Sequence, residues 1–482
     1  MTNVFSSILS DEPGSSTRRF LLWAVFWLIA PVFLGLFMAI LLYAPPVQLL
    51  EPVWLRPFIN FGRIRPLHVN LAIFGWLSMV YAGAILYLTP RLTGTKLYSE
   101  RLGNLTVFLW NVFVISMIIT LPLGLNTGRK YAEVIWPIKV LFVGLIVLLA
   151  INVWGTIRQR VEKNVYVSVW HFALAVTIFI PVYIIGNKVW PLEWVNGQLT
   201  WDFSGAYTGM NDDIINFFYV HNLFNSWFTT VAIGLAYYLL PKLTGKPLYS
   251  HRLAIWGFFT VWTGQHHQLW SPSPYWLQSL TVFFSILAAI PTSAFLFNFY
   301  KTMEGRWSLV VSDIRVRWLV VGTIFWGLTC VQGVAQSFPN FSLAVHFTNW
   351  VIGHSHLAFV GDYTFWMFAM VYILLPEVVK HPIFSRRLAE WHFWLTFIGL
   401  LIFMFALFAA GLIQGENWFA SVPFLQTVRA LNSFFFARLV GGAMMVVGQL
   451  IFAYNIYRTV TSSVPVQVRA PVPSALPAPA SE

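Results

Sequence analysis

Twelve long apolar runs, separated by short segments rich in Pro, Gly and charge, dominate this sequence of 482 residues. A run of roughly 20 apolar residues is long enough to cross a bilayer as a helix. Only 10% of the residues are charged, whereas soluble domains are near a quarter charged. We therefore predict an all-α polytopic membrane protein with twelve transmembrane helices and exclude a soluble multidomain protein. The predicted spans are 20–43, 65–89, 105–125, 134–156, 165–187, 212–240, 251–271, 275–300, 316–338, 342–375, 388–413 and 428–458.

The loops between these spans indicate how the chain is oriented. Loops after the even-numbered spans carry most of the loop Lys and Arg residues, and cytoplasmic loops carry this excess in membrane proteins. We therefore place both termini in the cytoplasm and expect no nucleic-acid partner, despite the net charge of +12. Residues 1–19 would be a cytoplasmic N-terminal segment, 20–458 the twelve-helix membrane domain, and 459–482 a flexible Pro/Ala-rich cytoplasmic tail. No repeat at a fixed period is evident.

Six of the eleven histidines are predicted to lie in one layer near the outer, non-cytoplasmic ends of four spans. His354 and His356, for example, would lie three to four turns into the span 342–375. A single histidine at such a position is more often a hydrogen-bonded core residue, but six at one depth favour a metal site. Because Cys330 is the only cysteine, ligation of iron or copper by imidazole is the expected chemistry. The six are His68, His221, His266, His267, His354 and His356.

Helix geometry divides these histidines among sites. Residues two apart on a helix point about 200° apart, so His354 and His356 cannot serve the same small metal site but could hold two different hemes. Adjacent His266 and His267 point about 100° apart and could both reach one metal, to which His221 could add a third nitrogen. Asn225 follows His221 by four residues on the same face, where it is either a metal contact or a hydrogen-bonding residue between helices.

Five stretches, three of which contain these histidines, resemble the catalytic subunit of the heme–copper superfamily, and the similarity extends over almost the whole chain. The similarity is greatest to the C-type (cbb-type) cytochrome c oxidases and their nitric oxide reductase relatives. The stretches are RPLHVNLAIFGW (65–76), LPLGLNTGRKYAEVIWPI (121–138), TGQHHQLWSPSPYWLQSL (263–280), TNWVIGHSHLAF (348–359) and GLIQGENW (411–418).

The resemblance implies a role for each candidate residue. His68 and His356 would be the axial pair of a low-spin heme b, and His354 the proximal ligand of a high-spin heme b. A non-heme iron or copper would be held by His221, His266 and His267. Heme propionates would pair with Arg438, Arg65 and His346, and Glu133 would bind calcium or bridge to a propionate.

The chain departs from the family pattern at the position of a catalytic tyrosine. Oxygen reductases of the superfamily need a phenol beside the metal, but its two family positions are Thr260 and Asn225 here. Nitric oxide reductases need no phenol, because coupling two NO molecules takes only two electrons and two protons. The best-known nitric oxide reductases have glutamates at the positions that are Asn225 and Ala288 here. The cbb-type oxidases have a glutamate at the position that is Gln332 here. We therefore predict a nitric oxide reductase with a His₃Asn site, whose catalytic residues include His354 of the facing heme.

The resemblance also implies partners and a location. No CxxCH motif is present, so a second subunit with heme c or a copper electron-entry centre is expected. The location would be the cytoplasmic (inner) membrane of a bacterium or archaeon. Two alternatives stay open: a cbb-type cytochrome c oxidase that reduces dioxygen to water, and a non-catalytic heme-binding transport or sensing protein.

Overall fold

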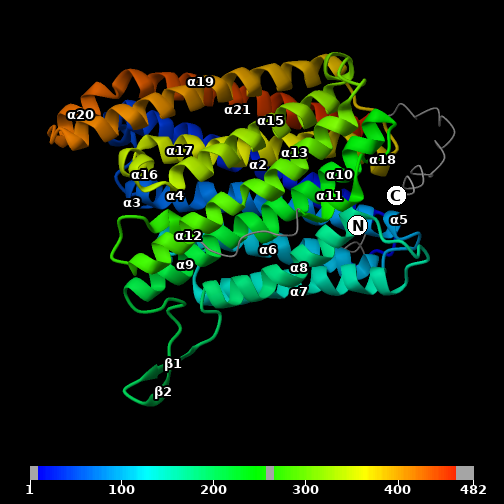
Figure 1. Ribbon diagram of the computed structural model, residues 1–482, viewed down its shortest axis with the longest axis horizontal. Coiled ribbons are helices and arrows are strands. Elements are labelled where there is room, and N and C mark those ends of the chain that lie inside the picture. Colours follow the sequence, from blue (N-terminus) through cyan, green and yellow to red (C-terminus); the bar gives the residue numbers. More distant parts are fainter. Residues whose placement is uncertain (1–8, 257–264, 463–482) are drawn as a thin grey trace. The chain divides into compact units, whose positions relative to one another are not determined.

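The computed structural model describes residues 9–256 and 265–462, which are mostly helical (Figure 1). Within these residues, eleven helical spans are long and apolar enough to cross a membrane. The all-α membrane fold is therefore confirmed. The remaining predicted span, 251–271, includes residues 257–264, which lie outside the described part; α11 (His251–Trp256) and the 3₁₀ helix η4 (Gln265–Gln268) flank them.

The elements follow one another along the chain with short connections. The first half contains α2 (Ser15–Tyr43), η1 (Pro45–Leu50), α3 (Arg56–Ile59), α4 (Phe61–Asn70), η2 (Leu71–Leu77), α5 (Ser78–Leu92), α6 (Glu100–Leu123), α7 (Trp136–Arg158), α8 (Val167–Gly186), β1 (Leu192–Val195), β2 (Gln198–Trp201), α9 (Met210–Asn222), η3 (Leu223–Thr229) and α10 (Thr230–Thr244). After α11 and η4 come α12 (Tyr275–Leu287), α13 (Ala289–Met303), α14 (Leu309–Ser312), α15 (Ile314–Ser337), α16 (Pro339–Val345), α17 (Asn349–His356), η5 (Leu357–Thr364), α18 (Phe365–Val379), α19 (Arg386–Phe419), α20 (Phe424–Ala430) and α21 (Asn432–Thr461).

The span predicted at 342–375 begins later than expected. The short helix α16 ends at Val345, and α17 begins at Asn349, where the Thr348 side chain caps it by accepting from the Trp350 amide at 3.2 Å. His354 therefore lies five residues after the start of α17, so the predicted depth of three to four turns is wrong. The apolar pattern did not reveal the cap, because a single threonine changes the mean hydropathy of a span very little.

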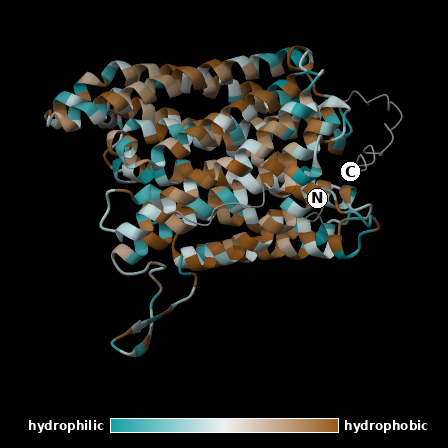
Figure 2. Ribbon diagram, in the orientation of Figure 1, coloured by the Kyte–Doolittle hydropathy of each residue, from teal (hydrophilic) through white to brown (hydrophobic). Residues whose placement is uncertain are grey.

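The described residues form two compact units. The first contains 9–34, 45–231 and 265–287, and the second contains 35–44, 232–256 and 288–462. In the first unit α7 and α8 lie side by side, and in the second α19 and α21 do so (Figure 1). Figure 2 shows hydrophobic residues along most of α7, as expected for a helix that faces lipid.

Three spans contain a π-helical stretch, and each stretch follows a candidate metal ligand. They are η2 after His68, η3 after His221, and η5 directly after His356. The amide of Ser78 bonds to the carbonyl of Ile73, five residues earlier instead of four. Such bulges are frequent at functional sites, because they change which side chains share a helix face.

The same set of hydrogen bonds between a capping serine and an asparagine on another helix, here called a polar clamp, occurs in three helix pairs. The sequence itself shows no repeat of fixed period. In the first pair, the Ser99 side chain caps α6, while Asn152 on α7 exchanges two hydrogen bonds with the Ser99 backbone at 3.1 and 2.9 Å. The same bonds join Ser250 to Asn298 and Ser385 to Asn455. Unequal spacing of the serines concealed this repeat. Each clamp satisfies backbone groups at a helix start, which would otherwise be unpaired.

A small β-hairpin is the one sheet in the described residues. Strands β1 and β2 pair antiparallel and project beyond the helices of the first unit (Figure 1). Asn196 and Gly197 form its turn with φ of 50° and 80°. Asn-Gly is the sequence that two-residue hairpin turns favour, because both positions need positive φ.

Candidate functional site

Three of the predicted metal ligands lie together in the first unit. His221 comes from the last turn of α9, and His266 and His267 come from η4. One ring nitrogen of each lies within 4.8 Å of those of the other two. Among the described residues, this is the only group of three or more His, Cys, Asp or Glu side chains with such spacing.

This spacing fits a transition-metal ion. Imidazole nitrogens bind such ions at about 2.1 Å, so three nitrogens on one ion are about 3.4 to 3.6 Å apart. The three nitrogens therefore need to approach one another by at most about 1.4 Å. They are already packed against one another, with ring centroids 4.6 Å apart for His221 and His266 and 4.2 Å apart for His266 and His267.

Ser285 on α12 fixes the tautomer of His266. Its hydroxyl donates to the Thr281 carbonyl at 2.7 Å, so it acts as acceptor for His266 Nδ1, also at 2.7 Å. Nδ1 therefore carries the proton, and Nε2 keeps the lone pair that binds a metal. Hydrogen bonds of this kind orient metal-bound histidines and increase their basicity.

Asn225 lies against His221, as the spacing of four residues predicts. The amide nitrogen Nδ2 is 2.7 Å from His221 Nε2. With a metal on Nε2 that lone pair is occupied, and a 180° turn of the amide would present the Oδ1 oxygen instead. The arrangement is compatible with Asn225 as an oxygen ligand or as a hydrogen-bonding neighbour.

The three candidate heme ligands share the same tautomer. Nδ1 of each ring lies near a carbonyl-type oxygen: Pro31 O for His68 at 2.7 Å, Gln332 Oε1 for His354 at 3.0 Å, and Ile352 O for His356 at 2.8 Å. Because these oxygens only accept, Nδ1 donates and Nε2 is left with its lone pair. Each of the three imidazoles could therefore bind a heme iron through Nε2.

The rings of His354 and His356 face different helices. His354 bonds to Gln332 on α15, whereas His356 packs against Phe403 on α19 with ring centroids 4.6 Å apart. This divergence agrees with the angle expected for residues two apart on a helix. Their assignment to separate hemes stays a prediction.

Arg438 on α21 and His356 both lie against the ring of Phe403. The guanidinium carbon of Arg438 is 5.4 Å from the Phe403 ring centroid, and the Nε of Arg438 has no hydrogen-bond partner among the described residues. Only 7% of the residue is exposed. A buried guanidinium without an acceptor is costly, so an anionic group such as a heme propionate fits this position.

Glu133 is buried in a cationic neighbourhood. It accepts a hydrogen bond from Asn70 Nδ2 at 2.7 Å, but burial raises the pKa of its carboxyl. Burial, reinforced by Arg65, lowers the pKa of Lys130 to about 8. Glu133 belongs to no group of three or more potential metal ligands in the described residues, whereas calcium takes six to eight oxygens.

Three predicted roles remain untested by this geometry: calcium at Glu133, and propionate pairing by Arg65 and His346. Arg65 lies one turn before His68 on α4. His346 follows α16, and its ring stacks on Phe347 with centroids 3.9 Å apart.

Sequence reasoning missed the partners of the candidate ligands. Ser285 and Gln332 are polar residues within apolar spans, and pairing them with nearby histidines could have identified both. The carbonyls of Pro31 and Ile352 could not be identified as hydrogen-bond acceptors from the sequence, because every residue has a backbone carbonyl.

Comparison with known proteins supports the membrane fold. Residues 15–444 match the family described as cytochrome c and quinol oxidase polypeptide I. The chain is 30% identical to the cbb3-type cytochrome c oxidase subunit CcoN1 of Stutzerimonas stutzeri, over 94% of this chain and 96% of that one. It is also 30% identical to a cytochrome c oxidase subunit 1 homolog of Azorhizobium caulinodans, over 91% and 81% of the two chains.

Two more distant similarities extend over most of the chain. A nitric oxide reductase subunit from Stutzerimonas stutzeri is 23% identical over 97% of this chain and 99% of that one. A heme–copper terminal oxidase dimer solved by cryo-EM shares the fold, with a TM-score of 0.76 and 14% identity over 94% of this chain and 85% of that chain. Since the family match covers most of its length, the chain belongs to the cytochrome c and quinol oxidase polypeptide I family, the membrane oxidoreductases known as heme–copper oxidase subunit I.

Proposed function

We propose that this subunit I reduces nitric oxide, converting two NO with two electrons and two protons into nitrous oxide and water. The observation that carries the proposal is the side chain next to the His221–His266–His267 group. On the helix face of His221 the adjacent side chain is the amide of Asn225, at a position where an oxygen reductase needs a phenol.

The nearby tyrosines do not supply that phenol. The hydroxyl of Tyr219 donates to the Tyr131 carbonyl at 2.9 Å, and Tyr275 is 83% exposed. Position Thr260 lies outside the described residues, but the sequence from 257 to 274 contains no tyrosine at all. A reaction without O–O cleavage fits a site of this composition.

The donor set fits the cofactors of the family. We assign His68 and His356 to a low-spin heme b, His354 to a high-spin heme b, and His221, His266 and His267 to a non-heme iron or copper. When bound, these groups would supply electron transfer and the open positions where a diatomic gas coordinates. Arg438 would neutralise a propionate.

The chain's own residues would keep these groups in place and adjust them. Ser285, Gln332 and the Pro31 carbonyl hold their imidazoles in the tautomer that presents Nε2. After a 180° turn of its amide, Asn225 would offer an uncharged oxygen, which would favour a higher oxidation state of a metal less than a carboxylate would. Electrons would enter through a second subunit with heme c or copper, and both termini would face the cytoplasm.

Dioxygen reduction is the second candidate. It is favoured by sequence identity, since the cbb3-type oxidase relative reaches 30% and the nitric oxide reductase relative 23%. The difference in identity is an average over the whole chain. The lack of a tyrosine at Thr260 and Asn225 instead affects the group that would react with dioxygen, so we give it more weight.

Turnover of one preparation with both gases separates the candidates. The intact complex, reduced chemically, should consume NO faster than dioxygen and release one N₂O for every two NO. Faster dioxygen consumption would overturn the proposal. So would a peptide whose mass shows a His–Tyr crosslink, since that bond marks an oxygen reductase.

A further inference from the structure

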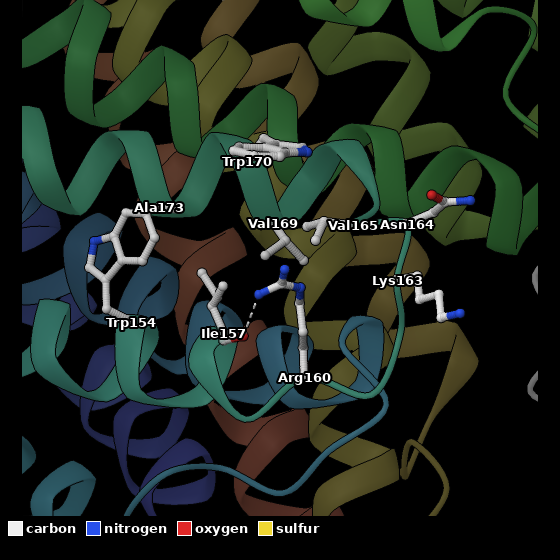
Figure 3. A pocket seen from close by; sticks show the side chains of 9 residues that line it. All are labelled: Trp154, Ile157, Arg160, Lys163, Asn164, Val165, Val169, Trp170 and Ala173. Carbon is white, nitrogen blue, oxygen red and sulfur yellow. Dashed lines mark hydrogen bonds between the residues drawn. The ribbon is translucent and has the colours of Figure 1, made fainter.

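A cavity of about 440 Å³ lies in the first unit where α7 ends and α8 begins (Figure 3). Its lining changes in character from one end to the other. Figure 3 shows Trp154 and Ala173 at one end and Lys163 and Asn164 at the other, with Trp170 and Arg160 on opposite walls. The lining residues are Trp154, Ile157, Arg160, Lys163, Asn164, Val165, Val169, Trp170 and Ala173.

The cavity lining carries positive charge that no carboxylate neutralises. No carboxylate lines the cavity, and neither Arg160 nor Lys163 forms an ion pair within the described residues. The nearest acidic residue in sequence, Glu162, packs its side chain against Gly94 instead. An anion that enters the cavity would therefore meet two cations and no competing carboxylate.

The walls of the cavity are fixed in position. The indole of Trp154 on α7 donates to the Thr177 hydroxyl on α8 at 2.9 Å. The loop between the helices is tied to the end of α5, because the amides of Val161 and Glu162 both donate to the Thr93 carbonyl, at 3.0 and 3.2 Å. A preformed cavity binds its ligand without the cost of ordering a loop.

The position of the cavity suits a molecule that is half in the membrane. Both helices are membrane spans, and the loop between them is one of those predicted to face the cytoplasm. Tryptophans gather at the membrane interface, and Trp170 is 54% exposed. Basic pockets between helices at this level suit acidic lipid headgroups.

We propose that the cavity binds an anionic phospholipid. Arg160 and Lys163 would hold the headgroup phosphate by charge-assisted hydrogen bonds, and an acyl chain would lie along Trp154, Ala173 and Trp170. A zwitterionic lipid binds less well, because its ammonium group is repelled by the same two cations. This site is independent of the gas chemistry proposed above.

Photocrosslinking tests this site in the purified complex. A photoactivatable phosphatidylglycerol should label the peptide 154–173, and the double variant R160Q/K163Q should need about thirtyfold more lipid for half-maximal labelling. The matched control is R158Q/K96Q, which removes the same charge from exposed residues that do not line the cavity. It should label like the unsubstituted protein.

Three outcomes would overturn the proposal. The first is equal labelling of the two double variants, and the second is equal labelling by photoactivatable phosphatidylcholine, which would indicate ordinary surrounding lipid. The third is competition by inorganic phosphate as strong as that by unlabelled phosphatidylglycerol, which would indicate a free-phosphate site. If R160Q/K163Q fails to fold, W170A should weaken labelling by removing the acyl-chain wall.

Discussion

The Nδ1 atom of His354 lies 3.0 Å from the amide oxygen of Gln332, so a neutral side chain holds the candidate high-spin heme ligand. A carboxylate in that place would attract the Nδ1 proton more strongly and make Nε2 a better donor to ferric iron. We expect Gln332→Glu to lower the midpoint potential of the high-spin heme, as measured by spectroelectrochemical titration. Gln332→Leu should instead reduce high-spin heme occupancy, and an unchanged potential in Gln332→Glu would contradict this role.

Ser285 provides a second test of an orienting hydrogen bond. Ser285→Ala removes the acceptor of His266 Nδ1 and should weaken binding of the non-heme metal by about 10- to 100-fold, the usual effect of losing such a partner. Metal analysis after dialysis against a chelator measures this loss. Ser285→Thr keeps a hydroxyl and should retain the metal, whereas equal retention in the alanine variant would show that Ser285 does not orient His266.

His221 separates the gas-binding site from the low-spin heme. His221→Ala removes one of three imidazoles of the candidate metal group, so NO turnover should fall to background. The visible spectrum of the low-spin heme should persist, because His68 and His356 are untouched. Loss of both hemes in this variant would contradict the assignment of ligands.

The β-hairpin should lose protection in acid. Lys188 forms ion pairs with Asp202 and Glu193. Burial favours a higher pKa for Asp202, but hydrogen bonds from Lys188 and Ser204 outweigh it and lower the pKa to about 2. Because the folded pKa lies below the ordinary value of 3.8, this stabilisation is complete above that value and is lost as the pH falls toward 2.

Hydrogen exchange of the hairpin amides, corrected for intrinsic rates, measures this effect. Protection should be greater at pH 5 than at pH 2 in the unsubstituted protein. Asp202→Asn should give low protection at both values. A pH-independent hairpin in the unsubstituted protein would show that the ion pair does not stabilise it.

The membrane fold could be predicted because each apolar run exceeds the bilayer thickness, and most observed spans agree with their predicted ends to within a few residues. The meeting of His221, His266 and His267 was also predictable, since spacing and depth restrict imidazoles within a bilayer to few partners. The late start of α17 at Asn349 was not, because a capping threonine hardly changes hydropathy. Nor were the π-helical stretches, whose extra residue depends on tertiary packing and not on composition.

The hydrogen-bond partners of the candidate ligands and of the capping serines could not be predicted from the sequence either. Gln332 was recognisable as an unusual residue within a span, but only the three-dimensional arrangement pairs it with His354. The repeated clamps of Ser99, Ser250 and Ser385 escaped detection because their partners lie on other helices at unequal distances along the chain.

Heme and metal stoichiometry of the purified subunit tests most directly whether six histidines hold two porphyrins and one bare ion. Pyridine hemochrome analysis combined with elemental analysis should give two b-type hemes and one non-heme iron or copper per chain. A single heme, or two hemes without a further metal ion, would contradict the assignment and favour a heme-binding protein without gas reduction.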